Sequence, residues 1–96
     1  MNIVILPSAQ EDLADDFAFY ERQSPGLGTY FFESLSSDID SLLLYAGVHR
    51  KAFGFHRLLS RRFPYAVYYS VGSETAFVRA VLDCRSDPIW IQKRLR

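Results

Sequence analysis

Apolar positions recur along this chain with two different periods, and the period changes near the middle. From Leu13 to Ala46 apolar side chains return every three or four residues, the spacing that places them on one face of an α-helix. After Gly47 they alternate with polar residues, the spacing of a strand whose two faces meet different surroundings. The pattern therefore predicts helices in the first half of the chain and strands in the second.

The first predicted helix follows a short strand at the N-terminus. Residues 2–6 form a β-branched run that Pro7 stops, as expected of a strand. Ser8 and Glu11 have the spacing of a capping box, so we expect the helix to take Ser8 as its N-cap and to end near Gln23. Its apolar stripe is formed by Leu13, Phe17 and Tyr20.

The second predicted helix covers about residues 29–45, and Gly47 is expected to stop it. Its apolar positions step by three and four residues: Phe32, Leu35, Ile39, Leu42 and Ala46. A stripe of this kind indicates core packing rather than a cofactor site. Because the link over 24–28 is short and contains two glycines, the two helices are expected to be antiparallel neighbours.

Three strands are predicted in the second half, over residues 55–62, 65–71 and 75–83. A three-residue connection over 72–74, which contains glycine, predicts a hairpin between the last two strands. The order is therefore β-α-α-β-β-β, followed by a short piece over 88–95. This order predicts an α+β fold of two layers, in which an antiparallel helix hairpin packs on a mostly antiparallel sheet.

Alternation along the last strand assigns its side chains to two faces. Ala76, Val78, Ala80 and Leu82 form an apolar set that we expect to lie under the helices. Arginines and tyrosines of the three strands are then expected to share the opposite, uncovered face. Such a face suits phosphate contact and base stacking, and it suits a protein–protein interface equally well.

The size and composition predict one small globular domain that spans residues 1–96. The chain is 49% apolar and 16% aromatic, which excludes a disordered protein. A domain of this size is marginally stable alone, which is consistent with a stabilising partner or a homodimer. No apolar run is long enough to cross a membrane, and the N-terminus lacks the positive region of a signal peptide. The single cysteine, Cys84, suits the reducing cytoplasm.

The net charge of zero hides a strong division between the two halves. Residues 1–48 carry eight acidic and one basic side chain, a net charge of −7, whereas residues 49–96 carry three acidic and ten basic ones, a net charge of +7. Such asymmetry is consistent with a polyanionic partner for the basic half. It is equally consistent with acidic helices that pack behind a basic sheet.

Few residues offer an alternative chemistry. His49 and His56 are seven residues apart, and zinc needs three or four ligands at tighter local spacing, so no metal site is expected. Cys84 near a strand end is more typical of a small packing residue than of a nucleophile. Gly26 and Gly28 are not followed by the Lys-Ser or Lys-Thr of a phosphate loop, and no cofactor is expected.

Several stretches of the chain have a characteristic order and spacing. They are the N-terminal strand, the helix opening Ser8–Leu13, the link Ser24–Gly28, Arg57, the segment Arg62–Tyr69 and the segment Ala80–Trp90. Taken together they cover nearly the whole chain and resemble the RelE/ParE superfamily of toxins from toxin–antitoxin systems. The resemblance points to the ParE-like, plasmid-stabilisation branch of that superfamily.

The resemblance implies a small cytoplasmic bacterial toxin of a type II system that inhibits growth. A cognate antitoxin, whose extended or helical tail wraps the toxin, is the implied partner. Two activities are implied as alternatives. RelE-like members cleave mRNA in the ribosomal A site, and ParE-like members poison DNA gyrase and are not nucleases.

The chain departs from the nuclease pattern at several positions. Ser86 stands where the family's corner has a second arginine, and Ala66 stands where RelE-like chains often have arginine. Asp83 and Cys84 replace a His-Gly pair, and Trp90 falls where the nucleases place a tyrosine. RNA cleavage by a 2′-hydroxyl needs a proton acceptor and a proton donor, and arginine remains protonated. We therefore expect gyrase-type inhibition, with mRNA cleavage and a non-toxic, antitoxin-binding protein as the alternatives.

The residues expected to contact the target are arginines with flat aromatic partners: Arg57, Arg61, Arg62, Tyr69, Arg79, Arg85 and Trp90. If the chain is instead an mRNA endonuclease, Arg57, Arg79 and Arg85 are expected to act catalytically. Their role would be to stabilise the negative charge that develops on the phosphorus oxygens.

Overall fold

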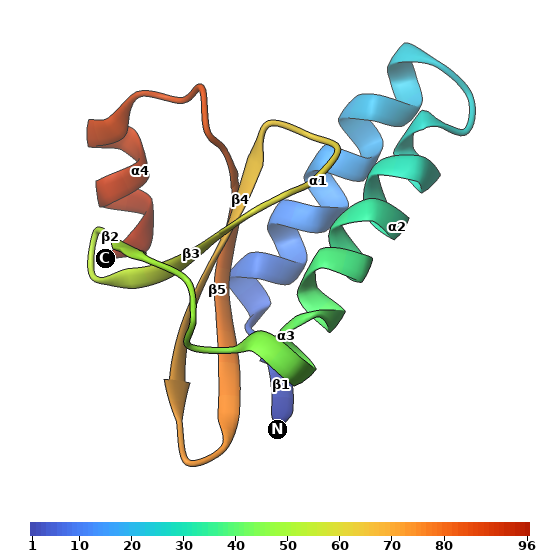
Figure 1. Cartoon of the computed structure of the whole chain (residues 1–96). Helices are drawn as coiled ribbons and strands as arrows, with labels where there is room; N and C mark the ends of the chain where they lie inside the picture. The colour runs from blue at the N-terminus through green and yellow to red at the C-terminus, as the bar shows by residue number, and fades with distance from the viewer.

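The computed structural model describes residues 1–96 and contains four helices and five strands (Figure 1). The elements in chain order are β1 (Asn2–Ile5), α1 (Pro7–Gln23), α2 (Leu27–Asp40), α3 (Leu42–Tyr45), β2 (Lys51–Ala52), β3 (Phe55–Leu59), β4 (Tyr65–Gly72), β5 (Thr75–Asp83) and α4 (Pro88–Leu95). Gly47 follows α3 with a φ of 94°, as predicted of a helix stop. None of the helices has the length and apolar character that crossing a membrane requires.

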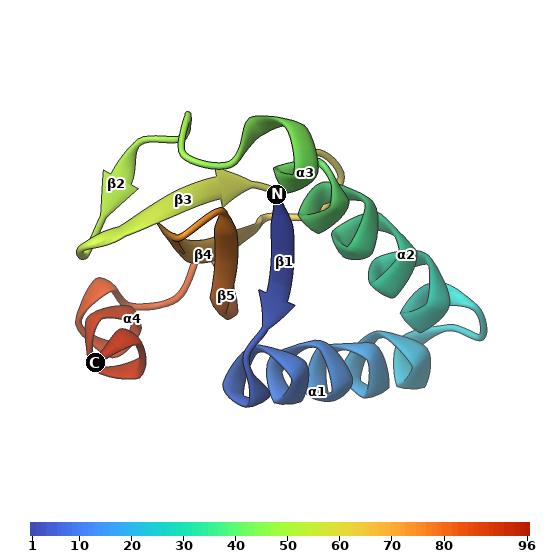
Figure 2. The ribbon, with the colours of Figure 1, turned by 90° about the horizontal axis from the view of Figure 1, so that it is seen from below.

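The five strands form one sheet in the order β1-β5-β4-β3-β2. β1 pairs with β5 in parallel, and every other neighbouring pair is antiparallel. Figure 2 shows the hairpin of α1 and α2 on one side of the sheet and α4 on the other. The predicted α+β class is therefore confirmed. The opposite face of the sheet, expected to be uncovered, is partly covered by α4, because Ile91 and Leu95 bury their side chains there.

The close contact between α1 and α2 depends on Gly28. A Cβ atom at this position would lie 2.5 Å from the Phe17 carbonyl oxygen and 2.9 Å from the Glu21 Cβ. The Glu21 carboxylate accepts hydrogen bonds from the N–H groups of Gly26 and Gly28, at 3.0 Å for the nearest oxygen in each case. The short link is therefore fixed by the last turns of α1, which makes the two helices antiparallel as predicted.

The predicted capping box at the start of the first helix is wrong. The helix begins two residues earlier, with Pro7 as its first residue and Leu6 as N-cap, and no side chain caps it. Proline suits this position because its missing N–H would have no helical partner there. The Ser8 hydroxyl instead donates a hydrogen bond to the Arg79 carbonyl oxygen at 2.8 Å.

The second predicted helix is interrupted at Ser41, so that α2 and α3 replace one continuous helix. The Ser41 hydroxyl donates to the Asp38 carbonyl oxygen at 2.6 Å, which competes with the regular helical bond. The first predicted strand of the second half is also too long, since β3 ends at Leu59 and a tight turn before Tyr65 follows. The short strand β2 was not predicted.

A β-bulge at Arg79 changes which side chains of β5 face the helices. Tyr69 pairs with Val78 and Tyr68 pairs with Ala80, so Arg79 has no partner in β4. Because one residue is inserted, the alternation reverses beyond it. Ala76 and Val78 pack in the cluster beneath the helices as predicted, together with Val81. The prediction is wrong for Ala80 and Leu82, which pack against α4.

Candidate functional site

The seven residues predicted to contact a target do not form one site. Arg57 lines a basic groove at the edge of β3, whereas Arg61 and Arg62 border a small polar cavity between α2 and the loop that follows β3. Tyr69 is 0% exposed, so its side chain cannot contact a target in this conformation. The burial arises because Tyr69 lies on the face of β4 that α2 and α3 cover.

The remaining three predicted residues lie near the chain's C-terminal segment. Arg79 donates to the Arg96 carbonyl oxygen at 2.6 Å, which joins the bulge to the end of α4. Arg85 forms an ion pair with Asp83 at 2.7 Å, and its hydrogen bonds hold the pKa of Asp83 below its usual value. Trp90 is half-exposed and lines an acidic groove. Only Arg57 among the predicted arginines therefore lies in a groove whose other charged residues are basic.

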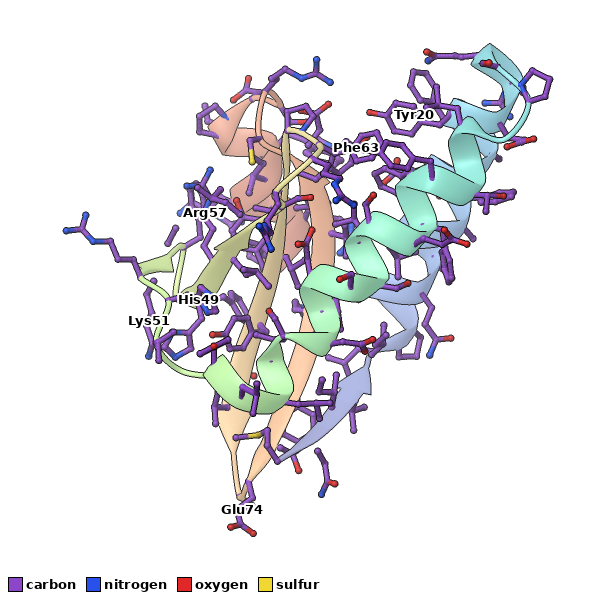
Figure 3. All side chains as sticks on the ribbon, turned by 45° about the vertical axis from the view of Figure 1, so that its right-hand side comes forward. Tyr20, His49, Lys51, Arg57, Phe63 and Glu74 are labelled. Carbon is purple, nitrogen blue, oxygen red and sulfur yellow. The ribbon has the colours of Figure 1, made fainter.

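The basic groove is a cavity of about 560 Å³ beside β2 and β3. Its lining residues are His49, Arg50, Lys51, Ala52, Arg57, Leu58 and Leu59. The lining contains no acidic residue, and the Nε atom of Arg57 is buried without a hydrogen-bond partner. Figure 3 shows His49, Lys51 and Arg57 at the same edge of the molecule, away from α1 and α2. The groove is therefore suited to an anionic group.

His49 is held in this groove by the buried hydroxyl of Tyr69. The Tyr69 oxygen accepts a hydrogen bond from the Gly47 N–H at 2.9 Å and lies 2.5 Å from the His49 Nδ1. Because Tyr69 is fully buried, its hydroxyl proton needs an acceptor, and the His49 Nδ1 provides it. His49 must then carry its own proton on Nε2. His49 therefore presents an uncharged Nε2–H donor to the basic groove.

The surroundings of His49 favour this neutral form. Burial lowers the pKa of His49, and the charge of the nearby His56 lowers it further. His56 donates from Nδ1 to the His49 carbonyl oxygen at 2.6 Å, and its ring stacks on Tyr69 with an interplanar angle of 24°. The groove therefore offers three cations and a neutral N–H, and no proton acceptor on His49.

A second groove, of about 430 Å³, is acidic. Its charged lining residues are Glu11, Asp12, Asp15, Asp16, Asp83 and Arg94. Burial raises the pKa of Asp16 to about 7, and repulsion from Asp12, Asp15 and Asp83 adds to the effect. Burial also raises the pKa of Asp12, although the Val81 N–H and Arg94 both act in the opposite direction. The groove concentrates the negative charge of the helical half.

A third groove, also about 430 Å³, is apolar and lies on the helical side of the molecule. It is lined by Ile5, Gln10, Leu13, Ala14, Phe17 and Phe32. Nearby, α3 and the residues after it expose several more large apolar side chains: Leu43, Leu44, Tyr45 and Val48. Leu44 is 81% exposed. Exposed apolar side chains at this density are typical of a surface that binds another protein.

Comparison with solved structures relates this arrangement to a known fold. A chain of the structure titled "Chromosomal ParDE TA system from P. aeruginosa" aligns with 84% of this chain and 92% of its own length, with a TM-score of 0.76 and 15% sequence identity. This chain has the fold of a ParDE system component. The fold expected from the resemblance to the RelE/ParE superfamily is therefore confirmed. No protein-family model and no curated protein matches the sequence.

The sequence pointed to Arg57 but not to its neighbours in the basic groove. The run from His49 to Lys51 follows a helix stop, and its three consecutive basic side chains are the feature of the sequence that could have indicated this groove. What the sequence could not give was the hydrogen bond between His49 and Tyr69, which joins positions twenty residues apart. Cys84 packs against the cluster beneath α4, as expected of a packing residue. No group of three or more potential ligands is arranged to hold a metal ion.

Proposed function

We propose that this chain is the toxin of a type II toxin–antitoxin module. In this proposal it acts in the cytoplasm by binding a macromolecular target such as DNA gyrase, and a cognate antitoxin holds it inactive. The observation that carries the proposal is the fold shared with a chain of the ParDE system. Fold alone does not determine activity, so the mode of action depends on the chemistry of the grooves.

The chemistry of the basic groove supports binding rather than RNA cleavage. Cleavage by a 2′-hydroxyl needs a group that accepts its proton. Arg50, Lys51 and Arg57 are cationic donors, and the Nδ1 of His49 is engaged by Tyr69. Trp90, which stands where the nucleases have a tyrosine, lies in the acidic groove and not in the basic one. The residues needed for acid–base chemistry are therefore not gathered around Arg57.

The apolar groove is the proposed antitoxin interface. Phe17 and Phe32 expose a third or more of their surface on neighbouring helices, and Leu13 of α1 and Ile5 of β1 also line the groove. A groove of this kind fits the apolar face of an amphipathic helix. Because α1 and α2 are strongly acidic, we expect the bound segment to carry basic residues beside its apolar face.

Induced expression in a bacterial host separates the proposed activity from its alternatives. Filamentation with a DNA-damage response and intact mRNA would support gyrase inhibition. A rapid halt of translation with mRNA cut at defined codons would replace this proposal with the endonuclease. Unaffected growth in several hosts would indicate the non-toxic, antitoxin-binding protein.

The proposed antitoxin interface has its own test, with the product of a small adjacent reading frame as the partner. Phe17→Glu and Phe32→Glu place a charge in the apolar groove and should abolish rescue by that partner while toxicity persists. Phe19→Glu is the matched control, because Phe19 is a comparably exposed phenylalanine of α1 outside the groove. If Phe19→Glu abolishes rescue as strongly as Phe17→Glu does, the groove is not the interface.

A further inference from the structure

We propose that the acidic groove binds a short aliphatic diamine or polyamine, an organic cation whose ammonium groups are joined by methylene chains. The proposed function leaves this groove unused, so the inference goes beyond it and does not depend on which macromolecule the chain inhibits. The groove lies where α1 and α4 meet beside the end of β5, and it shares no lining residue with the apolar groove (Figure 2). Its volume of about 430 Å³ is that of a small-molecule site.

The acidic groove holds carboxylates that the chain itself leaves without a partner. Asp12 accepts hydrogen bonds from the Val81 N–H and from Arg94, and Asp83 is paired with Arg85. Counted together with Arg85, the groove holds five carboxylates and two guanidinium groups, so its net charge is −3 when all are ionised. The carboxylates that accept no hydrogen bond and form no ion pair are Glu11, Asp15 and Asp16.

Asp16 is the free carboxylate that a cation would stabilise most. Its side chain is half-buried, and burial together with the charges of Asp12, Asp15 and Asp83 raises its pKa to about 7. No cation of the chain pairs with it. An ammonium group beside Asp16 would favour its ionised form, because an opposite charge at short range offsets the cost of burial.

Tyr65 offers a polar group at the base of the acidic groove. The residue is only 5% exposed, and its ring packs against Tyr20 and Phe31. Burial raises the pKa of Tyr65, and the charge of Asp16 raises it further, so the hydroxyl keeps its proton. None of the protein's hydrogen bonds to the groove carboxylates comes from this hydroxyl. It is therefore free to accept a hydrogen bond from an ammonium group.

Trp90 provides an aromatic wall, which favours an organic cation over a metal ion. The side chain belongs to α4, lines the groove and is 49% exposed. Tryptophan is the aromatic residue that binds ammonium groups best, and its ring also packs against methylene groups. No group of three or more potential ligands is arranged to hold a metal ion. Carboxylates beside an indole ring therefore fit a cation that carries hydrocarbon.

The free carboxylates lie at two depths, which favours a diamine over a monoamine. Asp16 is half-buried and close enough for its charge to act on Tyr65, whereas Glu11 and Asp15 are exposed. The helical rise separates Glu11 from Asp16 by about 7.5 Å along α1. An extended 1,4-diaminobutane molecule spans a comparable length. One ammonium group would then bind at Asp16 and Tyr65, and the other at the rim.

The direct test is a titration of the purified chain with 1,4-diaminobutane and with spermidine. The fluorescence of Trp90, the single tryptophan, should change in a saturable way, and the effect should weaken as salt rises from about 0.05 to about 0.3 M. 1-Aminobutane should bind about 5-fold more weakly or worse, because it lacks the second ion pair. Absence of saturable binding would overturn the proposal, as would equally tight binding of Mg²⁺ at the same ionic strength.

Two variants locate the site by calorimetry. Asp16→Asn removes the buried charge and should weaken binding about 10-fold, and Tyr65→Phe removes only the hydroxyl and should weaken it about 5-fold. Both should fold, because neither deleted group forms a hydrogen bond or an ion pair within the protein. The matched control is Glu33→Gln, an exposed carboxylate of α2 outside the groove, which should retain binding within about 2-fold. Equal loss in all three variants, or in none, would overturn the proposal.

Proton release tests whether Asp16 is the ligand. The charged and titratable groups that face it are Asp12 and Asp15 of α1, Tyr65 of β4, Asp83 of β5 and Arg94 of α4. Because the bound cation favours ionised Asp16, binding near pH 7 should release up to about half a proton per ligand. Calorimetry in two buffers of different ionisation enthalpy measures this release, which should vanish in Asp16→Asn. Binding of unaltered chain without proton release would contradict the assignment.

A lysine peptide distinguishes a free polyamine from a basic protein segment, since both carry ammonium groups. An acetylated and amidated hexapeptide of alternating lysine and alanine should bind more weakly than spermidine, because its backbone and branches exceed what the groove holds. Tighter binding of this peptide than of spermidine, abolished by Asp16→Asn, would overturn the free polyamine as the ligand and indicate a protein partner instead.

Discussion

The Asp12 carboxylate accepts a hydrogen bond from the Val81 N–H at 3.0 Å, in the part of β5 that extends past the end of β1. The other oxygen of Asp12 accepts from Arg94 of α4 at 2.7 Å. One side chain of α1 therefore satisfies the edge of β5 next to the bulge and also holds the C-terminal helix. Ser8 contributes in the same region through its bond to the Arg79 carbonyl oxygen.

Asp12→Ala is expected to destabilise the chain by about 2–3 kcal/mol. The loss leaves the Val81 N–H and the partly buried Arg94 guanidinium without their partner. Urea unfolding of the variant and the unaltered chain measures the difference. Asp15→Ala is the control, because Asp15 is an exposed carboxylate on the same helix without a hydrogen bond, and its effect should stay within about 0.5 kcal/mol. Equal effects would show that the Asp12 bonds contribute nothing specific.

Gly28→Ala is expected to cost about 2–3 kcal/mol, because the new Cβ would lie 2.5 Å from the Phe17 carbonyl oxygen and force the two helices apart. Gly72→Ala provides the comparison. A Cβ at Gly72 meets only the Phe77 ring, at 3.9 Å, so this substitution should be tolerated within about 0.5 kcal/mol. Thermal unfolding of both variants is the measurement. A Gly28→Ala protein as stable as Gly72→Ala would contradict the close helix contact.

The architecture could be predicted from the sequence wherever the local pattern of apolar residues was enough to determine the element. Two apolar stripes with a short link gave the helix hairpin, and alternation gave β4 and β5 almost residue by residue. The errors arose where a distant residue decides the local structure. No residue near Arg79 in the sequence indicates a bulge. The side chains that bond the backbone there are Ser8, at the Arg79 carbonyl oxygen, and Asp12, at the Val81 N–H, and both lie about seventy residues away in the sequence. The reversed faces of Ala80 and Leu82 follow from that single inserted residue.

The candidate site was less accessible to sequence reasoning than the fold. Basic residues could be counted, but their distribution over separate grooves and loops depends on the path of the chain between them. Tyr69 was expected to be exposed, because alternation cannot say which face of β4 the helices cover. The neutral state of His49 depends on that buried hydroxyl. It could not be inferred before the two residues were placed side by side.

His49 should make the chain less stable in mild acid. Its pKa in the folded protein is lowered by burial and by His56, so the unfolded state binds the proton more readily. By linkage, the contribution of His49 is fully present above a pH of about 6.5 and is lost as the pH falls below that value. His49→Gln keeps an acceptor for the Tyr69 hydroxyl and does not titrate. Urea midpoints between about pH 5 and pH 7.5 should therefore fall less for the variant, and identical slopes would contradict the neutral form of His49.

Asp16 has the opposite linkage. Its pKa is raised to about 7 by burial and by the nearby carboxylates, so folding favours the protonated form. Its contribution is therefore present below a pH of about 4 and is lost as the pH rises toward 7. Asp16→Asn should stabilise the chain at pH 7.5 by about 1 kcal/mol, after allowance for screening by solvent in the open groove. Glu33→Gln removes the same charge from an exposed site of α2 and should have a negligible effect on the urea midpoint, and an equal gain from it would contradict the acidic-groove account.

The most direct measurement of the central claim is DNA supercoiling by purified gyrase in the presence of the purified chain, with an intact mRNA and ribosomes assayed in parallel. The proposed function predicts that the chain inhibits supercoiling in a dose-dependent way and leaves the mRNA uncut. It also predicts that the product of the adjacent reading frame restores supercoiling when added in equal amount. Undiminished supercoiling together with ribosome-dependent cuts in the mRNA would contradict the account and establish the endonuclease instead.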